Sequence, residues 1–274
     1  MGSRRLATAA TIEFESSAMS DVAPSTSDAA KSPRGRLLIT LCTYNEIENI
    51  PKLIPEIHEF APDAHVLVVD DNSPDGTGKL ADELAAQDER IHAIHRQGKL
   101  GLGTAIVAGF RYGIEHGYET LINMDADFSH HPRHIPALRE CLDSSDVGIG
   151  SRYVPGGGVV GWNWKRHFMS TSINLYARLL LGLPNKDNSG SFRCYRISDL
   201  AKLDFDQVRS RGYSFQEEIL YMCRRIGCRQ LETPITFEDR RFGTSKISWK
   251  ESVSALWVIF RLAIDRIVRR RVTL

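Results

Sequence analysis

Two aspartates one residue apart are the clearest chemical feature of this sequence. Asp125 and Asp127 follow the short apolar run 120–124 and precede a Ser-His-His-Pro segment. If the run is a strand, both carboxylates lie on one side of the chain at the strand's C-terminal end. Two such carboxylates repel each other unless a cation lies between them, and oxygen ligands suit Mg²⁺ or Mn²⁺. The alternative is a strand followed by an ordinary helix cap. The arrangement of the surrounding elements distinguishes a cation site from such a cap.

Those elements alternate between strand and helix. Apolar runs rich in β-forming residues predict strands at 37–41, 65–69, 91–94, 120–124 and 147–150, with helical patterns between them. This alternation predicts an α/β fold in which a mostly parallel sheet has helices on both faces. Ligands collect at the carboxyl ends of strands in such sheets. Four of these ends carry polar clusters: Tyr44 and Glu46, Asp70 and Asp71, Asp125 and Asp127, and Arg152.

The second half of the chain has fewer strand patterns. A glycine-rich segment, 155–161, precedes an expected helix at about 165–181, and another helix opens near Tyr213. An edge strand is expected at 234–237. His130 and His131 could suggest a metal site, but adjacent residues of an extended chain point in opposite directions. Structural roles are therefore expected for both.

Composition narrows the class of protein. Charged residues make up 25% and hydrophobic residues 42% of the 274 residues, which is ordinary for a globular protein. The formal net charge of +1 gives no global attraction to nucleic acid, so no nucleic-acid partner is expected. The five cysteines are odd in number and scattered, which favours free thiols in a reducing cytosol over a zinc site. The sequence contains no run of 18 uninterrupted apolar residues, so no transmembrane helix is expected.

We expect three parts along the chain. Residues 1–35 lack the apolar stretch of a signal peptide and read as a disordered tail and linker. Residues 36–248 form the α/β domain, and 249–274 form an amphipathic, basic helix. From residue 240 onward there are nine Lys or Arg and two acidic residues, which suits an anionic membrane surface. A terminal helix packed on its own domain is the alternative.

An ordered set of motifs runs along the chain over about residues 37–260. The pieces are Tyr44-Asn45-Glu46, Asp70-Asp71-Asn72-Ser73-Pro74-Asp75-Gly76-Thr77, Lys99-Leu100-Gly101-Leu102-Gly103, Asp125-Ala126-Asp127, Gly150-Ser151-Arg152-Tyr153, Trp162 with Lys165-Arg166, Ser189-Gly190-Ser191-Phe192-Arg193, and Asp239-Arg240 with Ser245-Lys246. This set resembles family-2, inverting, GT-A glycosyltransferases, and more closely the dolichyl-phosphate (polyprenyl-phosphate) mannosyltransferases. Asp-x-Asp alone is a weak match, whereas the ordered set is specific. The resemblance implies a GT-A, Rossmann-like fold.

The resemblance also implies roles for individual residues. Asp125, Asp127 and Ser129 would hold Mg²⁺ or Mn²⁺, although many relatives carry Gln in place of Ser129, so a water could replace that ligand. Arg152, Arg166 and Ser170 would hold the phosphate of a lipid acceptor, and Asp127 and Arg152 would be catalytic. The nucleotide-sugar donor would contact Cys42 (often Pro in relatives), Tyr44, Glu46, Val69, Asp71, Asp125, Ala126, Asp127, Arg240 and Lys246.

The reaction that the resemblance implies is inverting transfer of mannose from GDP-mannose to a polyprenyl or dolichyl phosphate, giving a β-linked product. A phosphate oxygen is already ionised at neutral pH, so no general base is expected, and Glu217 and Glu218 are expected to support the acceptor loop. The alternatives are a UDP-glucose or other hexose donor, or a non-catalytic nucleotide-sugar-binding membrane adaptor. The expected location is peripheral, on the cytoplasmic face of a membrane, where separate membrane subunits could anchor the chain.

Overall fold

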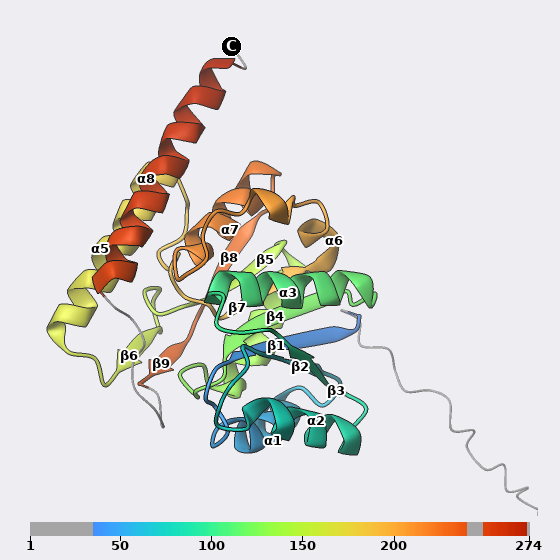
Figure 1. Cartoon of the computed structure of the whole chain (residues 1–274). Helices are drawn as coiled ribbons and strands as arrows, with labels where there is room; N and C mark the ends of the chain where they lie inside the picture. The colour runs from blue at the N-terminus through green and yellow to red at the C-terminus, as the bar shows by residue number, and fades with distance from the viewer. Residues whose placement is uncertain (1–34, 240–248, 273–274) are drawn as a thin grey trace, which may run out of the picture. The chain divides into compact units, whose positions relative to one another are not determined.

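A seven-stranded sheet forms the centre of the molecule, with strand order β3-β2-β1-β4-β7-β5-β8 (Figure 1). The computed structural model describes residues 35–239 and 249–272, all within one compact unit. β7 runs antiparallel to both of its neighbours, and the other pairs are parallel. The predicted mostly parallel α/β sheet is therefore confirmed. Its strands are β1 (Leu37–Thr43), β2 (His65–Asp70), β3 (Ile91–His95), β4 (Thr120–Asp125), β5 (Val147–Ser151), β7 (Arg193–Arg196) and β8 (Gln230–Pro234).

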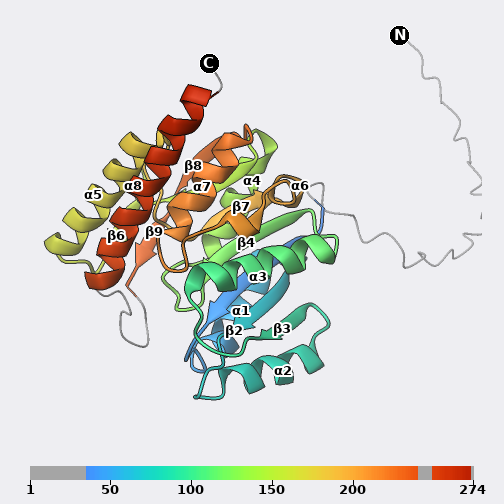
Figure 2. The ribbon, with the colours of Figure 1, turned by 45° about the horizontal axis from the view of Figure 1, so that its top comes forward.

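Helices cover both faces of this sheet (Figures 1 and 2). Side chains of a strand alternate between the faces, so Leu38 packs in the core that contains α3 and α7 residues, whereas Ile39 packs in the core that contains α1 and α4 residues. The helix α5 packs against α8. The helices are α1 (Ile50–Phe60), α2 (Thr77–Gln87), α3 (Leu102–Glu115), α4 (Ile135–Glu140), α5 (Trp164–Leu181), α6 (Ile197–Leu200), α7 (Phe215–Arg225) and α8 (Trp249–Val272), with short 3₁₀ turns at Pro132–His134, Cys141–Asp143 and Phe205–Gln207.

A second, two-stranded parallel sheet pairs β6 (Gly158–Val160) with β9 (Thr236–Glu238). The expected edge strand at 234–237 corresponds to the end of β8 and most of β9. The helix α1 begins at Ile50, after a turn in which Asn45 adopts a left-handed backbone with φ of 60°. The predicted disordered tail falls outside the described residues, except for Gly35.

The strand order reverses beside β1. After β3, on one side of the sheet, the chain crosses to β4 on the other side of β1. In open α/β sheets, a crevice forms at the carboxyl ends of the strands that flank such a reversal. The carboxyl ends of β1, β2 and β4 lie side by side at this edge of the sheet, and the sequence predicts donor-binding residues at all three ends.

Candidate active site

The strand register brings predicted donor-binding residues side by side. On β1, Cys42 pairs in register with Val69 of β2 and with Asp125 of β4. Burial, with smaller effects of Asp71 and Asp125, raises the pKa of the Cys42 thiol. The thiol therefore stays protonated and uncharged. Ala126 follows in a buried position after the end of β4.

The two aspartates at the end of β2 have different neighbours. Asp70 accepts hydrogen bonds from the hydroxyls of Thr43, at 2.9 Å, and Ser73, which fixes the two loops to each other. Asp71 instead pairs with Arg96 at 2.6 Å, and both side chains are largely buried. Burial raises the pKa of Asp71, and Arg96 opposes that shift. Arg96 therefore supplies a cation beside a predicted nucleoside contact.

The loop that carries Arg96 also reaches the first predicted donor loop. The Lys99 ammonium lies 4.7 Å from the centre of the Tyr44 ring, in cation–π geometry. Tyr44 and Glu46 are partly buried, and Glu46 accepts a hydrogen bond from the side chain of Asn49 at 2.7 Å. The loops after β1, β2 and β3 thus contact one another, and the first two carry predicted donor-binding residues.

The metal-binding prediction rests on Asp125 and Asp127. The Asp125 side chain is 35% exposed, whereas Asp127 is buried and accepts a hydrogen bond from the Ser129 N–H at 3.1 Å. Two carboxylates and a hydroxyl are the oxygen donors that Mg²⁺ and Mn²⁺ prefer, so the residues fit such an ion. Within the described ranges no three His, Cys, Asp or Glu side chains form a metal cluster. Further ligands would therefore come from a hydroxyl, water or the donor.

The two histidines after this pair face different partners. His130 is buried, and its Nδ1 accepts a hydrogen bond from the Asp125 N–H at 3.1 Å. Its proton must then reside on Nε2, and burial lowers its pKa, so the ring stays neutral. His131 approaches Glu56 at 3.2 Å. His130 thus fixes the backbone of a predicted metal ligand, which agrees with the structural roles expected from the sequence.

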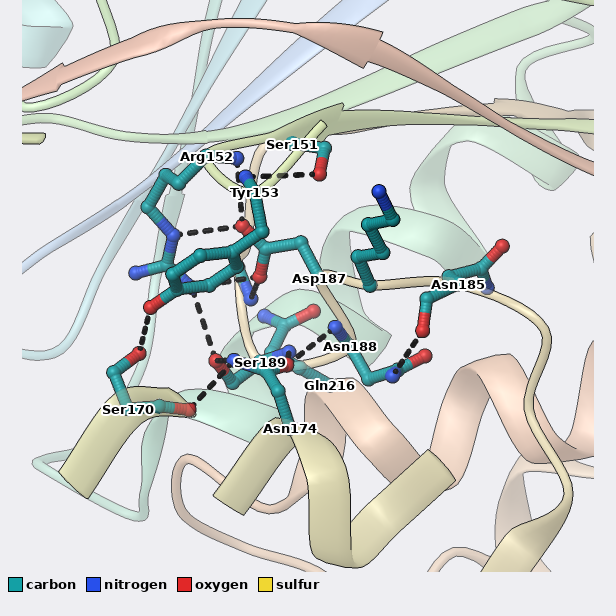
Figure 3. Close-up of polar contacts among 12 residues, drawn as sticks. Ser151, Arg152, Tyr153, Ser170, Asn174, Asn185, Asp187, Asn188, Ser189 and Gln216 are labelled. Carbon is teal, nitrogen blue, oxygen red and sulfur yellow. Dashed lines mark hydrogen bonds and ion pairs between the residues drawn. The ribbon is translucent and has the colours of Figure 1, made fainter. Parts of the chain in front are cut away.

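Arg152 lies in a buried ion pair (Figure 3). Its Nε and Nη2 donate to the two carboxylate oxygens of Asp187, each at 2.7 Å. Burial disfavours the charge of Arg152, but Asp187 outweighs this effect and raises the pKa of the guanidinium. The arginine is therefore charged and held in one orientation. Asp187 was not predicted, because its contact with Arg152 spans 35 positions of the sequence.

The three predicted lipid-phosphate residues gather around two aromatic rings. The Tyr153 hydroxyl donates to Ser170 Oγ at 2.6 Å (Figure 3). The Arg166 guanidinium lies 4.3 Å from the centre of the Trp162 ring, and that of Arg152 lies 5.4 Å from it. The structure therefore brings together two cations and a hydroxyl from the loop after β5 and from α5.

Comparisons with known proteins identify the family. Residues 38–204 match the family model described as "Glycosyl transferase family 2". The chain belongs to this family. It is 44% identical over 84% of its length to the polyprenol monophosphomannose synthase of Mycolicibacterium smegmatis, and covers 88% of that protein. It is 46% identical over 78% of its length to the undecaprenyl-phosphate mannosyltransferase of Micrococcus luteus, again with 88% of that protein covered.

Solved structures share the fold of this transferase at lower identity. The mannosyltransferase PcManGT from Pyrobaculum calidifontis, in complex with GDP-Man and Mn²⁺, superposes with a TM-score of 0.56 at 16% identity, over 88% of this chain and 67% of that one. Glucosyl-3-phosphoglycerate synthase from Mycobacterium tuberculosis, in complex with Mn²⁺ and UDP, gives 0.54 at 17% identity, over 89% and 81%. These likenesses confirm the predicted GT-A fold.

Four other residues were given roles from the sequence: Arg240, Lys246, Glu217 and Glu218. Arg240 and Lys246 lie outside the described residues, so their expected contacts with donor phosphates stay predictions. Glu218 accepts hydrogen bonds from the N–H groups of Arg209 and Ser210, the latter at 2.8 Å, and so holds the loop before α7. Its expected support of an acceptor loop stays a prediction. Glu217 is buried in the transferase, and burial raises its pKa to about 7.

Proposed function

We propose that this transferase moves mannose from GDP-mannose to a polyprenyl phosphate. The observation that carries this proposal is the 44% identity, over 84% of the chain, to a polyprenol monophosphomannose synthase. The mannosyltransferase from Pyrobaculum calidifontis, which has the same fold, binds GDP-Man and Mn²⁺, and this supports the choice of donor and of a divalent cation. Mg²⁺ remains the alternative ion, since both accept the same oxygen ligands.

On the donor side, the nucleoside would lie beside Tyr44 and Asp71, with its diphosphate near Asp125 and Asp127. A bound divalent cation would neutralise charge that develops on the departing diphosphate. Asp127 is buried and Asp125 is fixed by hydrogen bonds. The chain therefore holds these carboxylates in place before the substrate arrives, which favours catalysis because no reorganisation is required.

On the acceptor side, an ionised phosphate oxygen would form a bond to the anomeric carbon of mannose. The bond between that carbon and the diphosphate oxygen breaks, and its electron pair leaves with GDP. A single displacement from the face opposite the leaving group inverts an α-linked donor to a β-linked product. The phosphate oxygen carries no proton that must be removed, so the step requires no general base.

Arg152 and Arg166 would bring the two negatively charged substrates together. Within the described residues, no acceptor takes a hydrogen bond from Nη1 of Arg152, whose Nε and Nη2 bind Asp187. We propose that this nitrogen would donate to the incoming phosphate. A cation with a fixed orientation stabilises the charge of the transition state better than a mobile one. By fixing Arg152, Asp187 would therefore contribute to catalysis.

A donor comparison tests this function. Purified protein is incubated with a short prenyl phosphate, Mg²⁺ or Mn²⁺, and either labelled GDP-mannose or labelled UDP-glucose. We expect a lipid-soluble product from GDP-mannose. A product from UDP-glucose alone would mean that the donor is UDP-glucose and not GDP-mannose. Binding of a nucleotide sugar with no transfer from any donor would instead favour the non-catalytic adaptor.

We further propose that α5 and α8 lie against an anionic membrane. The 18 residues of α5 include no Asp or Glu but do include Lys165, Arg166 and Arg178. Its neighbour α8 also exposes large apolar side chains. Exposed apolar residues beside basic ones suit a negatively charged lipid surface. The exposed apolar residues of the two helices are Trp164, Phe168, Met169, Leu175, Leu179, Leu256, Trp257, Phe260 and Ile264.

This proposal places the protein peripherally on the cytoplasmic face of the membrane, where its lipid acceptor would be, with or without separate membrane subunits. Among the described helices, none is both long and apolar enough to cross a bilayer. The surface of α5 also lies close to the predicted acceptor site, because Ser170 is part of this helix. A lipid phosphate at Ser170 would thus have its chain near the apolar surface.

Vesicle binding tests the membrane proposal. The double substitution Phe168→Glu with Leu179→Glu places two negative charges on exposed positions of α5, so it should strongly reduce co-sedimentation with phosphatidylglycerol vesicles. Ile226→Glu is the matched control, because Ile226 is similarly apolar and exposed but follows α7. Equal vesicle binding of the double variant and the control would contradict the proposal.

A further inference from the structure

The loop 187–191, between α5 and β7, contacts both the donor side and the acceptor side of the site. Figure 3 shows Asp187 beside Arg152, and Asn188 and Ser189 beside Asn174 of α5. None of its side chains was nominated from the sequence, although the motif from Ser189 to Arg193 matches the family. Its contacts connect a predicted metal ligand to a predicted acceptor-binding arginine.

At the donor end, Ser191 holds Asp125. The Ser191 hydroxyl donates to Asp125 Oδ1 at 2.6 Å. The Ser191 carbonyl in turn accepts a hydrogen bond from the Asn123 side chain at 3.0 Å, which ties the loop to β4. A hydrogen bond to a metal-binding carboxylate orients that ligand and tunes its affinity for the metal. Ser191 therefore determines which way the Asp125 carboxylate faces.

At the acceptor end, Asp187 holds Arg152. Besides the two guanidinium contacts, its carboxylate accepts the backbone N–H groups of Arg152, at 3.0 Å, and Gly190, at 3.1 Å. These four bonds use the four acceptor positions of a carboxylate. Asp187 is completely buried, so it cannot exchange these partners for water.

The middle of the loop is fixed to α5. Ser189 Oγ accepts hydrogen bonds from Arg152 Nη2 and from the Asn174 side chain, both at 3.0 Å. Asn174 also accepts the backbone N–H groups of Asn188 and Ser189, at 2.6 and 3.0 Å. Every residue from 187 to 191 thus has a hydrogen-bonding partner in the loop, in α5 or near the strand ends. These bonds restrain the backbone along the whole loop.

We infer that the loop 187–191 is a rigid connection that sets the Asp125 carboxylate and the Arg152 guanidinium in one geometry, with Asp187 and Ser191 as positioning residues. This inference rests on the proposed function, because it assigns metal binding to Asp125 and acceptor binding to Arg152. Transfer needs the donor and acceptor within a narrow distance and angle, and small displacements reduce rates severely. A shared loop would keep the two binding groups aligned.

The test uses Ser191→Ala and Asp187→Asn. Two binding constants are measured for each variant: that of Mn²⁺ in the presence of GDP, by electron paramagnetic resonance, and that of a short prenyl phosphate, by isothermal titration. We expect Ser191→Ala to weaken Mn²⁺ binding about tenfold or more. We expect Asp187→Asn to weaken prenyl phosphate binding by a similar factor. The connection further predicts that each variant also weakens the ligand at the opposite end at least about threefold.

Two control variants remove similar groups far from the site. Ser145→Ala removes a buried serine hydroxyl, which donates to the Cys141 carbonyl at 2.7 Å. Asp63→Asn removes the carboxylate that pairs with Arg139 at 2.9 Å. Both should leave the two binding constants unchanged. If Asp187→Asn does not fold by circular dichroism, Ser189→Ala replaces it, since it removes one hydroxyl that contacts Arg152.

Effects confined to the nearer ligand, with the farther binding constant equal to that of the controls, would overturn the inference. These binding constants do not depend on turnover. If the unsubstituted protein binds both ligands but transfers no mannose, the proposed function fails while the inference about the loop is judged on the binding constants alone. If both variants match the controls for both ligands, the loop has no positioning role.

Discussion

At the scale of single residues, the site depends on how each charge is compensated. Asp71 has Arg96 beside it and Arg152 has Asp187, each pair at 2.6–2.7 Å and largely or fully buried. Removing one partner of such a pair leaves an uncompensated buried charge, which is strongly destabilising. Asp125 is different, because its carboxylate is partly exposed and held mainly by a neutral hydroxyl. It is therefore the carboxylate best suited to meet a cation.

Asp127→Asn is expected to lower the transfer rate about 100-fold or more, because it removes a charge that would hold the cation beside the leaving diphosphate. The amide has nearly the same shape, so the melting temperature should change little. Initial rates with Mn²⁺ measure the effect. Asp206→Asn, a surface carboxylate paired with Arg111, is the control. Activity of Asp127→Asn equal to the control would place the metal elsewhere.

Glu217 predicts a pH effect on stability. Burial raises its pKa from 4.5 to about 7, so the folded state holds this proton more tightly than the unfolded state does. The folded protein is therefore penalised as pH rises from about 4.5 to about 7, and the full penalty persists above that range. Glu217→Gln removes the titration.

Urea unfolding at pH 5 and pH 8 measures this effect. The difference in free energy of unfolding, Glu217→Gln minus the unsubstituted protein, should be more positive at pH 8 than at pH 5. The variant should thus be relatively more stable at pH 8. Glu59→Gln, on the exposed part of α1, provides the control and should show no such difference. A relative stability of Glu217→Gln that does not vary with pH would show that Glu217 titrates normally.

At the scale of elements, the N-terminus of α3 packs closely against the loop before α7. The Gly103 N–H donates to the Arg211 carbonyl at 2.9 Å. A Cβ at Gly103 would lie 2.7 Å from the Ser210 carbonyl and 2.9 Å from the Phe215 side chain. The close approach of α3 to the loop before α7 therefore requires glycine at this position. It also explains why Gly103 belongs to a motif that precedes a helix.

Gly103→Ala should lower the free energy of unfolding by about 1–3 kcal/mol, because the added methyl group would overpack this contact. Gly98→Ala is the matched control, since a Cβ there meets no atom within 4 Å. Chemical denaturation compares the two variants. Equal stability would mean that the loop before α7 can move away from α3 without cost.

At the scale of the whole molecule, the parallel part of the sheet was the easiest to predict. Strands β1, β2, β4 and β5 are buried on both faces, so they appear in the sequence as short apolar runs, and their polar ends converge because all of them point to one edge. β8 was missed because its sequence, Gln-Leu-Glu-Thr-Pro, contains no apolar run. For β7, the antiparallel direction and the burial of Arg193 were not predicted, because arginine is usually found at the surface.

The site was predicted where its residues form motifs and missed where they meet through folding. Asp125 and Asp127 are recognisable together because one residue separates them. The partners Arg96 and Asp187 are not, because each meets its ion-pair partner across 25 or 35 positions of the chain. Such pairing is set by the order of strands in the sheet, and a single sequence does not encode that order in any local pattern.

The most direct test of this account is the chemical structure of the product formed from GDP-mannose and a short prenyl phosphate. The purified protein, with Mn²⁺ present, should give a mannosyl prenyl phosphate whose anomeric centre is β by nuclear magnetic resonance, and excess EDTA should prevent its formation. Mannose that remains in GDP-mannose under these conditions, or that appears only as free sugar, would show that this chain does not transfer mannose to a polyprenyl phosphate.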